Sequence, residues 1–301
     1  MKIYLTIFGL YFRVLSLLSN KIAGQKAFQF LQKPRKLKFR QRENQFYQNT
    51  KTYLLHTEYG EIPCYETGNS NGKLVILVHG WESNAGSLSG IGHLLAEQGF
   101  RVISFDLPAH GNQNATHTNL FECKEVLKSL VSYLNPAHDF SIVSHSFGSA
   151  VATYAMSEVN YSLDQFICLS SPNKLAFLFE TFKEMFQLPA KPYKIMLEKI
   201  ETLFGKPLEK ISVEKMMPSV NYKNLTIIHD INDKVLPFAF SKQIAASSSS
   251  SELITIKNVG HYRMVWDRDV FTFVLNRLST SARIEPKLTA PLDPSILHPQ
   301  Y

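Results

Sequence analysis

The sequence predicts an α/β protein built on a mostly parallel, doubly wound sheet of about eight strands. Short apolar runs rich in β-branched residues recur along the chain, and helix-compatible stretches separate the later runs. With 301 residues and 45% hydrophobic content, the chain can bury one large core. We expect residues 50–280 to form this domain, 1–49 a basic helical leader, and the proline-containing stretch 281–301 an extended tail.

The strands are expected in chain order as a hairpin followed by six further runs. The hairpin pairs 52–56 with 62–66, and the later strands cover 74–78, 101–105, 140–144, 165–169, 225–229 and 252–257. Helices are expected over 86–98, 120–134, 147–158, 238–246 and 266–278. This alternation is typical of crossovers on both faces of a parallel sheet.

A long interval separates the sixth and seventh predicted strands. Its apolar residues recur at helical spacing, which predicts two or more amphipathic helices within 173–217. Such a stripe has to pack against something, whether the body of the domain or the mouth of a site. The aromatic residues Phe179 and Phe182 make this interval a candidate for contact with an acyl or aromatic substrate.

Ser146 is the first candidate for catalysis. It lies in Ser144-His145-Ser146-Phe147-Gly148, between the apolar run 140–143 and a helix-compatible stretch. This context predicts a sharp strand-to-helix turn that raises the serine hydroxyl above the sheet. Small residues at 144 and 148 suit such a turn, because strand and helix backbones pass close together there.

The loop after the strand at 74–78 is the second candidate. It begins His79-Gly80-Trp81, and Gly80 allows the backbone to turn so that the Trp81 N–H faces a cavity. The N–H of Phe147, at the start of the next helix, would be a second donor. Together they predict an oxyanion hole, and we expect His79 and Gly80 to line the substrate site.

Two further strand ends carry a carboxylate and an imidazole. Asp230 and Asp233 both follow the strand at 225–229, and either could serve as the acid. His261 follows the strand at 252–257, with Gly260 allowing close approach. Ser, Asp and His thus follow one another along the chain, each at the end of a strand. The ends of strands are where open α/β sheets gather functional side chains.

From these residues the chain resembles the α/β-hydrolase superfamily over roughly residues 50–280. The resemblance implies an α/β-hydrolase fold with a helical cap at 173–217 and a nucleophile at Ser146. It implies Asp233 as the acid, since Lys234-Val235-Leu236-Pro237 follows it as in the family, and His261 as the base. Phe105 to Gly111 is also family-like, although Ala109 and Ser144 stand where glycine is common.

These residue types suit acyl transfer through serine. A serine hydroxyl is a poor nucleophile at neutral pH unless a histidine accepts its proton and a carboxylate orients that histidine. We therefore predict a carboxylesterase-like serine hydrolase that cleaves an ester or thioester through an acyl-enzyme. Two alternatives stay open: an acyltransferase with the same triad, and a noncatalytic small-molecule-binding protein with the same fold.

No cofactor, metal ion or nucleic-acid partner is expected. The remaining histidines lack metal-ligand spacing, and His229 is expected to pack or to cap the end of a strand. The three cysteines are widely spaced, which indicates neither a disulfide framework nor a zinc motif. The expected partner is a small ester or acyl compound.

Positive charge is concentrated at the N-terminus. Ten basic residues precede Glu43, the first acidic residue, within a chain of net charge +7. Ile3, Ile7, Leu10, Val14 and Leu17 form a helical apolar stripe in this region. Residues 1–42 could therefore contact an anionic membrane surface, or dock on the domain through Ala23, Gly24 and Ala27.

The apolar stretch from Ile3 to Phe12 is too short to cross a bilayer, and Arg13 interrupts its extension. No A-x-A-like cleavage site follows it. We expect a cytoplasmic protein, with membrane association through residues 1–42 as the open alternative.

Overall fold

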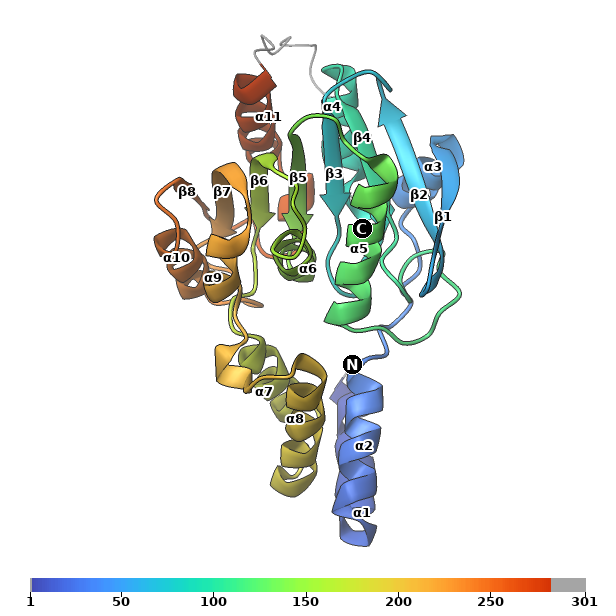
Figure 1. Ribbon diagram of the computed structural model, residues 1–301. Coiled ribbons are helices and arrows are strands. Elements are labelled where there is room, and N and C mark those ends of the chain that lie inside the picture. The colour runs from blue at the N-terminus through green and yellow to red at the C-terminus, as the bar shows by residue number, and fades with distance from the viewer. Residues whose placement is uncertain (1, 283–301) are drawn as a thin grey trace.

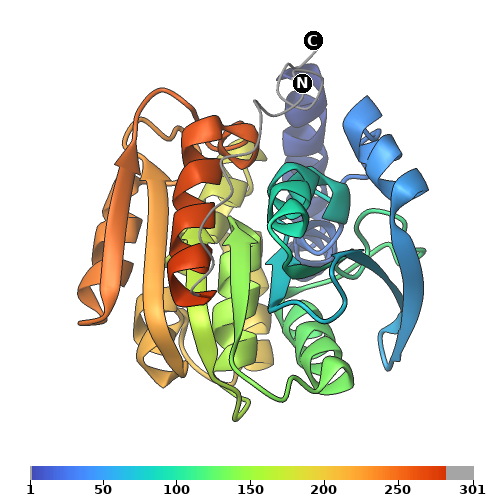
Figure 2. The ribbon, with the colours of Figure 1, turned by 90° about the horizontal axis from the view of Figure 1, so that it is seen from above.

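The computed structural model describes residues 2–282, with side chains described from 5 to 280. The predicted tail at 281–301 therefore lies almost entirely outside the described residues. The fold is an eight-stranded sheet with helices on both faces (Figure 1, Figure 2). The predicted fold class is confirmed.

The sheet has the strand order β1-β2-β4-β3-β5-β6-β7-β8. Its strands are β1 Lys51–Thr57, β2 Gly60–Gly68, β3 Leu74–Val78, β4 Arg101–Phe105, β5 Phe140–His145, β6 Leu163–Leu169, β7 Tyr222–Asp230 and β8 Ser251–Ile256. β2 is antiparallel to both β1 and β4, and all other neighbouring strands are parallel. Each predicted strand overlaps one of these.

The register brings the strand ends that carry the candidate residues to one edge of the sheet. Val78 pairs with Ser144, and His145 pairs with Leu169. Leu169 in turn pairs with Ile228, and Asp230 pairs with Ile256. The loops that follow β3, β5, β7 and β8 therefore leave the sheet side by side, as expected for parallel strands.

Five helices follow the predicted crossovers. They are α4 Ser89–Glu97, α5 Leu120–Leu134, α6 Phe147–Met156, α10 Phe238–Ala246 and α11 Arg268–Ala282. α4 and α11 share one apolar cluster, while α5, α6 and α10 share the other on the opposite face. Asn119 caps α5 by accepting hydrogen bonds from Phe121 N and Glu122 N, which explains why this helix begins where it does.

The interval between β6 and β7 is helical. α7 Leu175–Met185 and α8 Ala190–Phe204 form a pair that lies beyond the carboxyl edge of the sheet (Figure 1). Gly205, in the left-handed conformation with φ +63°, ends α8. The chain returns to β7 through a 3-10 turn at Leu208–Lys210, the short helix α9 Val213–Met216 and a 3-10 turn at Met217–Ser219.

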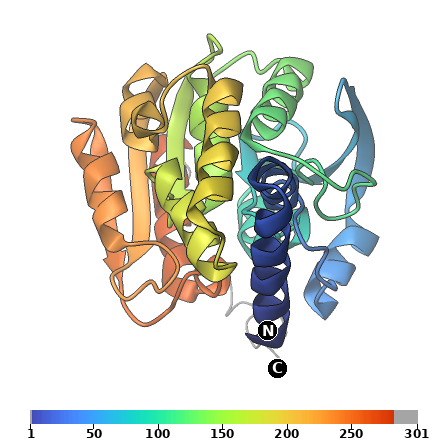
Figure 3. The same ribbon diagram turned by 90° about the horizontal axis from the view of Figure 1, so that it is seen from below.

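The N-terminal region forms three helices. α1 Lys2–Leu18 and α2 Asn20–Leu31 form a hairpin beside α7 and α8, and α3 Gln41–Asn49 leads into β1 (Figure 3). Within residues 2–282, no helix has the length and apolarity that crossing a bilayer requires.

The docking prediction for residues 1–42 holds for α2 and for the segment that follows it. Ala23, Gly24 and Ala27 are buried, and a Cβ on Gly24 would lie 2.7 Å from the Ile195 side chain of α8. The basic stretch after α2 also contacts the domain, because Arg35 pairs with Glu82 (Nε to Oε1 2.8 Å). The described part of the predicted stripe on α1 does not dock, since Ile7, Leu10, Val14 and Leu17 are exposed; the side chain of Ile3 lies outside the described residues.

Candidate active site

Ser146 lies on a strained turn between β5 and α6. Its φ of +52° and ψ of −125° are rare for a residue with a side chain, and its N–H donates to Leu169 O at 2.9 Å. A Cβ on Gly148 would lie 2.4 Å from the carbonyl oxygens of both Val78 and His79. Only glycine fits at 148 because α6 starts directly against the end of β3.

Ser144, where the resembled family often has glycine, is held by hydrogen bonds. Its hydroxyl is fully buried and lies within hydrogen-bond distance of Ile167 O (3.1 Å) and Ser149 Oγ (3.0 Å). Ala109, at the other such position, has a φ of +63°, a conformation that glycine adopts more easily. Both departures are thus accommodated without displacing the turn at Ser146.

The structure brings Ser146, His261 and Asp233 into one hydrogen-bonded chain. His261 Nε2 lies 2.9 Å from Ser146 Oγ, and His261 Nδ1 lies 2.7 Å from Asp233 Oδ2. Because the carboxylate can only accept, Nδ1 carries the hydrogen and Nε2 is free to accept the serine proton. Asp233 and His261 are almost completely shielded from solvent, whereas Ser146 is partly accessible.

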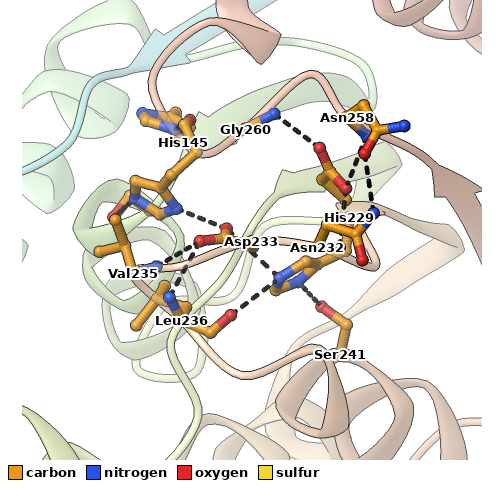
Figure 4. Close-up of polar contacts among 12 residues, drawn as sticks. His145, His229, Asn232, Asp233, Val235, Leu236, Ser241, Asn258 and Gly260 are labelled. Carbon is orange, nitrogen blue, oxygen red and sulfur yellow. Dashed lines mark hydrogen bonds and ion pairs between the residues drawn. The ribbon is translucent and has the colours of Figure 1, made fainter.

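The environment of Asp233 keeps it ionised. Burial by itself would raise the pKa of its carboxyl group, but hydrogen bonds from His229 and His261 and from the Leu236 backbone hold that pKa well below its usual range. Val235 N and Leu236 N donate to Asp233 Oδ1 at 2.7 and 3.0 Å (Figure 4). The carboxylate is thus fixed in position and charge beside the imidazole.

Asp230, the competing carboxylate, is the last residue of β7. It accepts backbone hydrogen bonds from Asn232 (2.8 Å), Asn258 (3.2 Å) and Gly260 (2.6 Å). Burial would raise its pKa, and these backbone donors lower it overall. Asp230 therefore ties the loop after β7 to the loop that carries His261, and the structure places Asp233, not Asp230, at the imidazole.

Two histidines outside the predicted site support the arrangement. His229 Nε2 lies 3.4 Å from Asp233 Oδ2 and 3.3 Å from Leu236 O, while its Nδ1 lies 2.6 Å from Ser241 Oγ (Figure 4). Since both neighbours of Nε2 are acceptors, Nε2 carries the hydrogen. His145 Nε2 lies 2.9 Å from the backbone oxygen of His261. The sequence alone did not distinguish either residue from a packing histidine.

The imidazole of His145 is uncharged. Burial, aided by the nearby His261, lowers its pKa to about 3. Its Nε2–H can therefore donate to the carbonyl of His261 and hold that segment of backbone against the turn at Ser146. The segment Ser144 to Gly148 thus contributes His145 as a positioning group as well as Ser146.

The predicted oxyanion loop lies against Ser146. A Cβ on Gly80 would come within 3.2 Å of Ser146 Cβ, a contact so tight that the neighbouring atoms would have to shift to admit a side chain there. In the described part of the chain, the backbone N–H groups of Trp81 and Phe147 have no hydrogen-bond acceptor. The Trp81 and Phe147 rings meet edge to face at 5.2 Å.

His79 lies beneath this loop. Leu107 N donates to its Nε2 at 3.0 Å, and its Nδ1 is 2.8 Å from Gly80 O. Burial lowers its pKa to about 4, so the ring is neutral. The imidazole thus joins the loops after β3 and β4, and the part of this residue beside the site is its backbone.

Phe179 and Phe182 lie on α7 and are half-buried. The Phe182 ring packs against Phe30 of α2 and Phe186, with centroids 6.2 and 4.8 Å away. Phe182 therefore already has one aromatic partner in the N-terminal hairpin and another directly after α7. Contact of either ring with a substrate stays a prediction.

A buried carboxylate that sequence reasoning missed organises the loops near Trp81. Asp106 accepts hydrogen bonds from Tyr47 Oη and Tyr65 Oη and from the backbone N–H groups of Ala85 and Asn112, at 2.8–3.0 Å. These donors come from α3, β2 and the loops after β3 and β4. Asp106 thus links the N-terminal region to the loop that bears Gly80.

Comparison with known proteins finds a family that resembles part of the chain. Residues 75–191, which span the loop after β3, Ser146 and all of α7, match the alpha/beta hydrolase family. Together with the fold, this match confirms the predicted resemblance to the α/β-hydrolase superfamily.

Related proteins agree with this assignment. The chain is 30% identical over 98 residues to a serine hydrolase-like protein of Dictyostelium discoideum, and the match covers 32% of the chain and 27% of that relative. It is also 30% identical over 70 residues to an AB hydrolase superfamily protein of Gibberella zeae, covering 23% of the chain and 24% of the relative. The matches thus span about a quarter of the length of these curated relatives.

Solved structures show the same fold. An esterase of Pyrococcus furiosus superposes with a TM-score of 0.63 at 20% identity, covering 83% of this chain and 97% of that one. An esterase of Exiguobacterium antarcticum superposes with a TM-score of 0.59 at 16% identity, covering 77% of this chain and 100% of that one.

Among residues 2–282, no cluster of three or more His, Cys, Asp or Glu side chains is arranged to hold a metal ion.

Proposed function

We propose that this protein is a serine hydrolase that cleaves a carboxylic ester or thioester through an acyl-enzyme. The observation that carries the proposal is the chain from Ser146 Oγ through His261 to Asp233, at 2.9 and 2.7 Å. A buried, ionised carboxylate on Nδ1 orients the ring and stabilises the imidazolium that forms when Nε2 takes the serine proton. The esterases with a similar fold agree with this class of substrate.

In the first half of the reaction, Ser146 Oγ attacks the carbonyl carbon while its proton passes to His261 Nε2. The negative charge on the carbonyl oxygen would be stabilised by the N–H groups of Trp81 and Phe147, which have no other acceptor among the described residues. Collapse of this intermediate breaks the bond to the alcohol or thiol, which takes the proton from His261 and leaves. The acyl group stays on Ser146.

In the second half, water attacks the acyl carbon and gives its proton to His261. The same two N–H groups stabilise the second oxyanion, and its collapse frees the carboxylic acid and returns the proton to Ser146. An acyltransferase would differ only in the acceptor, since an alcohol or amine would replace the water. We further propose that Phe179, and to a lesser extent Phe182, contact the acyl part of the substrate.

A fluorophosphonate probe tests the proposal directly, because it reacts only with an activated serine. We expect the wild-type protein to be labelled and Ser146→Ala to be unlabelled, with kcat on an activated ester reduced roughly 10⁴–10⁶-fold. Ser157→Ala is the matched control, since Ser157 lies at the far end of α6 and only its hydroxyl bond to Tyr154 O is lost. It should be labelled like the wild type.

An activated-ester panel of varied acyl length, with a thioester beside it, then defines the substrate class. A folded protein that is neither labelled nor turns over any ester, yet binds acyl compounds equally well after Ser146→Ala, would contradict the proposal and favour a binding protein. If the acyl group were transferred to an added alcohol faster than to water, the protein would instead be an acyltransferase.

A further inference from the structure

Helix α1 is apolar on two opposite faces. On the inner face, Phe8 packs against Phe30 of α2 and Phe186 after α7, with ring centroids 4.7 and 6.1 Å away, and Phe12 is buried. On the outer face, apolar side chains recur three or four positions apart along one side of the helix. This outer face of α1 consists of Ile7, Leu10, Tyr11, Val14, Leu17 and Leu18.

The outer face is open to solvent. Exposure along it ranges from 46% at Tyr11 to 88% at Leu17, and Leu18 beside it is 79% exposed. Of the fifteen exposed large apolar side chains in the described part of the chain, six lie on this face and a seventh, Ile22, lies at the start of α2. Apolar side chains gathered on one helix mark an interaction surface, whereas scattered ones need no explanation.

The hairpin that carries this face is positively charged. Arg13, Lys21, Lys26 and Lys33 are exposed, and no ion pair is described for them. No acidic residue precedes Glu43 in the sequence. Apolar surface and unneutralised positive charge therefore occur together on α1 and α2.

The position of the hairpin leaves this surface accessible. α2 is held by α8 through Gly24, while α1 lies on the outside and the turn between the helices is the part farthest from the sheet (Figure 1, Figure 3). Leu17 and Leu18 lie at that turn. The hairpin is thus anchored to the domain by α2 and presents α1 outward.

We propose that the α1–α2 hairpin binds an anionic lipid surface, with the outer face of α1 inserted among the acyl chains just below the headgroups. α1 is about 25 Å long at 1.5 Å per residue and would lie in the plane of the interface. Its outer side chains supply the apolar contribution, and the exposed Arg and Lys residues meet acidic headgroups. The domain would remain outside the membrane.

Charge favours a lipid surface over a second copy of the chain. Pairing two outer faces would bring two positively charged hairpins together with no acidic residue in either of them. An anionic bilayer instead neutralises these charges, and each of them adds to the attraction near such a surface. The same stretch that lacks acidic residues thus determines the kind of partner.

Vesicle flotation of the full chain tests the proposal. We expect the protein to float with vesicles of phosphatidylcholine containing about 30% phosphatidylserine at low salt, and to bind vesicles of phosphatidylcholine alone about tenfold less. The double change Leu17→Ser and Leu18→Ser should reduce binding about tenfold or more without unfolding the protein, because both side chains are exposed. Lys21→Gln with Lys26→Gln should weaken binding and reduce its dependence on salt.

The matched control changes two exposed apolar residues elsewhere, Leu54→Ser on β1 and Tyr133→Ser on α5. This variant should float like the wild type. Failure of the wild type to float with acidic vesicles at low salt would overturn the proposal. A second result would also overturn it: light scattering shows that the wild type is a dimer, the Leu17 and Leu18 changes dissociate that dimer, and the protein does not bind vesicles. The outer face would then be a contact between copies of the chain.

Discussion

At the scale of single residues, two carboxylates three positions apart have different surroundings and different roles. Asp233 faces His261 and His229, while Asp230 faces only backbone N–H groups from the turn after β7 and the loop of His261. Asp230 is the last residue of β7, and Asp233 lies in the turn that follows it. Their separation arises because β7 ends at Asp230 and the chain reverses before reaching Asp233.

We predict that Asp233→Asn lowers kcat by about 10⁴-fold on an activated ester, because a neutral amide neither fixes the His261 tautomer nor stabilises the imidazolium. Circular dichroism should show that the variant remains folded.

Asp230→Asn is the informative comparison. It should lower the free energy of unfolding by about 1–3 kcal/mol, because a neutral amide oxygen accepts the N–H groups of Asn232, Asn258 and Gly260 less strongly. Its effect on kcat should be far smaller. Equal losses of kcat in the two variants would mean that the carboxylates share the catalytic role.

At the scale of elements, the contact between α2 and α8 decides where the N-terminal hairpin lies. The two helices approach closely because position 24 has no side chain: an added Cβ would lie 2.7 Å from Ile195 Cβ and 2.8 Å from Pro192 O. Ala23 and Ala27 are buried in the same contact. Small residues on one helix thus let the hairpin pack on the insertion that follows β6.

We predict that Gly24→Val lowers the free energy of unfolding by about 1–3 kcal/mol and exposes the hairpin to limited proteolysis, since the added methyl groups must push the helices apart. Gln29→Val places the same side chain on the exposed face of α2 and should have little effect. Chemical denaturation and trypsin digestion measure both. Similar stability of the two variants would mean that the contact between α2 and α8 is looser than the structure indicates.

At the scale of the whole molecule, the site rests on several neutral histidines packed around the strand ends. Burial lowers the pKa of His79 to about 4 and, with the influence of neighbouring histidines, lowers the pKa values of His110 and His145 to about 3. In the unfolded chain these groups titrate near 6.5. The unfolded state therefore binds more protons than the native state below about pH 6.5.

It follows that the free energy of unfolding should fall as the pH is lowered from about 6.5 towards 4. Each of the three histidines contributes up to about 1.4 kcal/mol per pH unit in that window. Burial raises the pKa of Asp106, so this group by itself would make the free energy of unfolding rise as the pH falls. It is a single group, whereas three histidines act in the other direction. Urea denaturation at several pH values measures the slope. Constant stability from pH 7 to 5 would contradict this prediction.

Much of the fold and the site was predictable from local pattern. Strand runs bounded by polar loops, and the short segments at Ser146, Gly80 and His261, depend on neighbours in sequence. The sequence did not identify His229, His145 and Asp106 as supports of the site. A histidine or aspartate has the same sequence context whether it packs in the core, caps a strand or supports a site. Their partners Asp233, His261 and Tyr47 are 4, 116 and 59 positions away in the chain.

The sequence by itself determined the α/β class, the order of the strands along the chain and the residues at the ends of β3, β5, β7 and β8, because backbone sterics and apolar periodicity act over a few residues. The residues by themselves left Asp230 and Asp233 open, the family resemblance favoured Asp233, and the tertiary structure places Asp233 at His261. The tertiary structure alone decided that α2 docks on α8 while the outer face of α1 stays exposed. Those outcomes depend on which surfaces meet after the chain folds. A helix with two apolar faces can bury only the one that finds a partner.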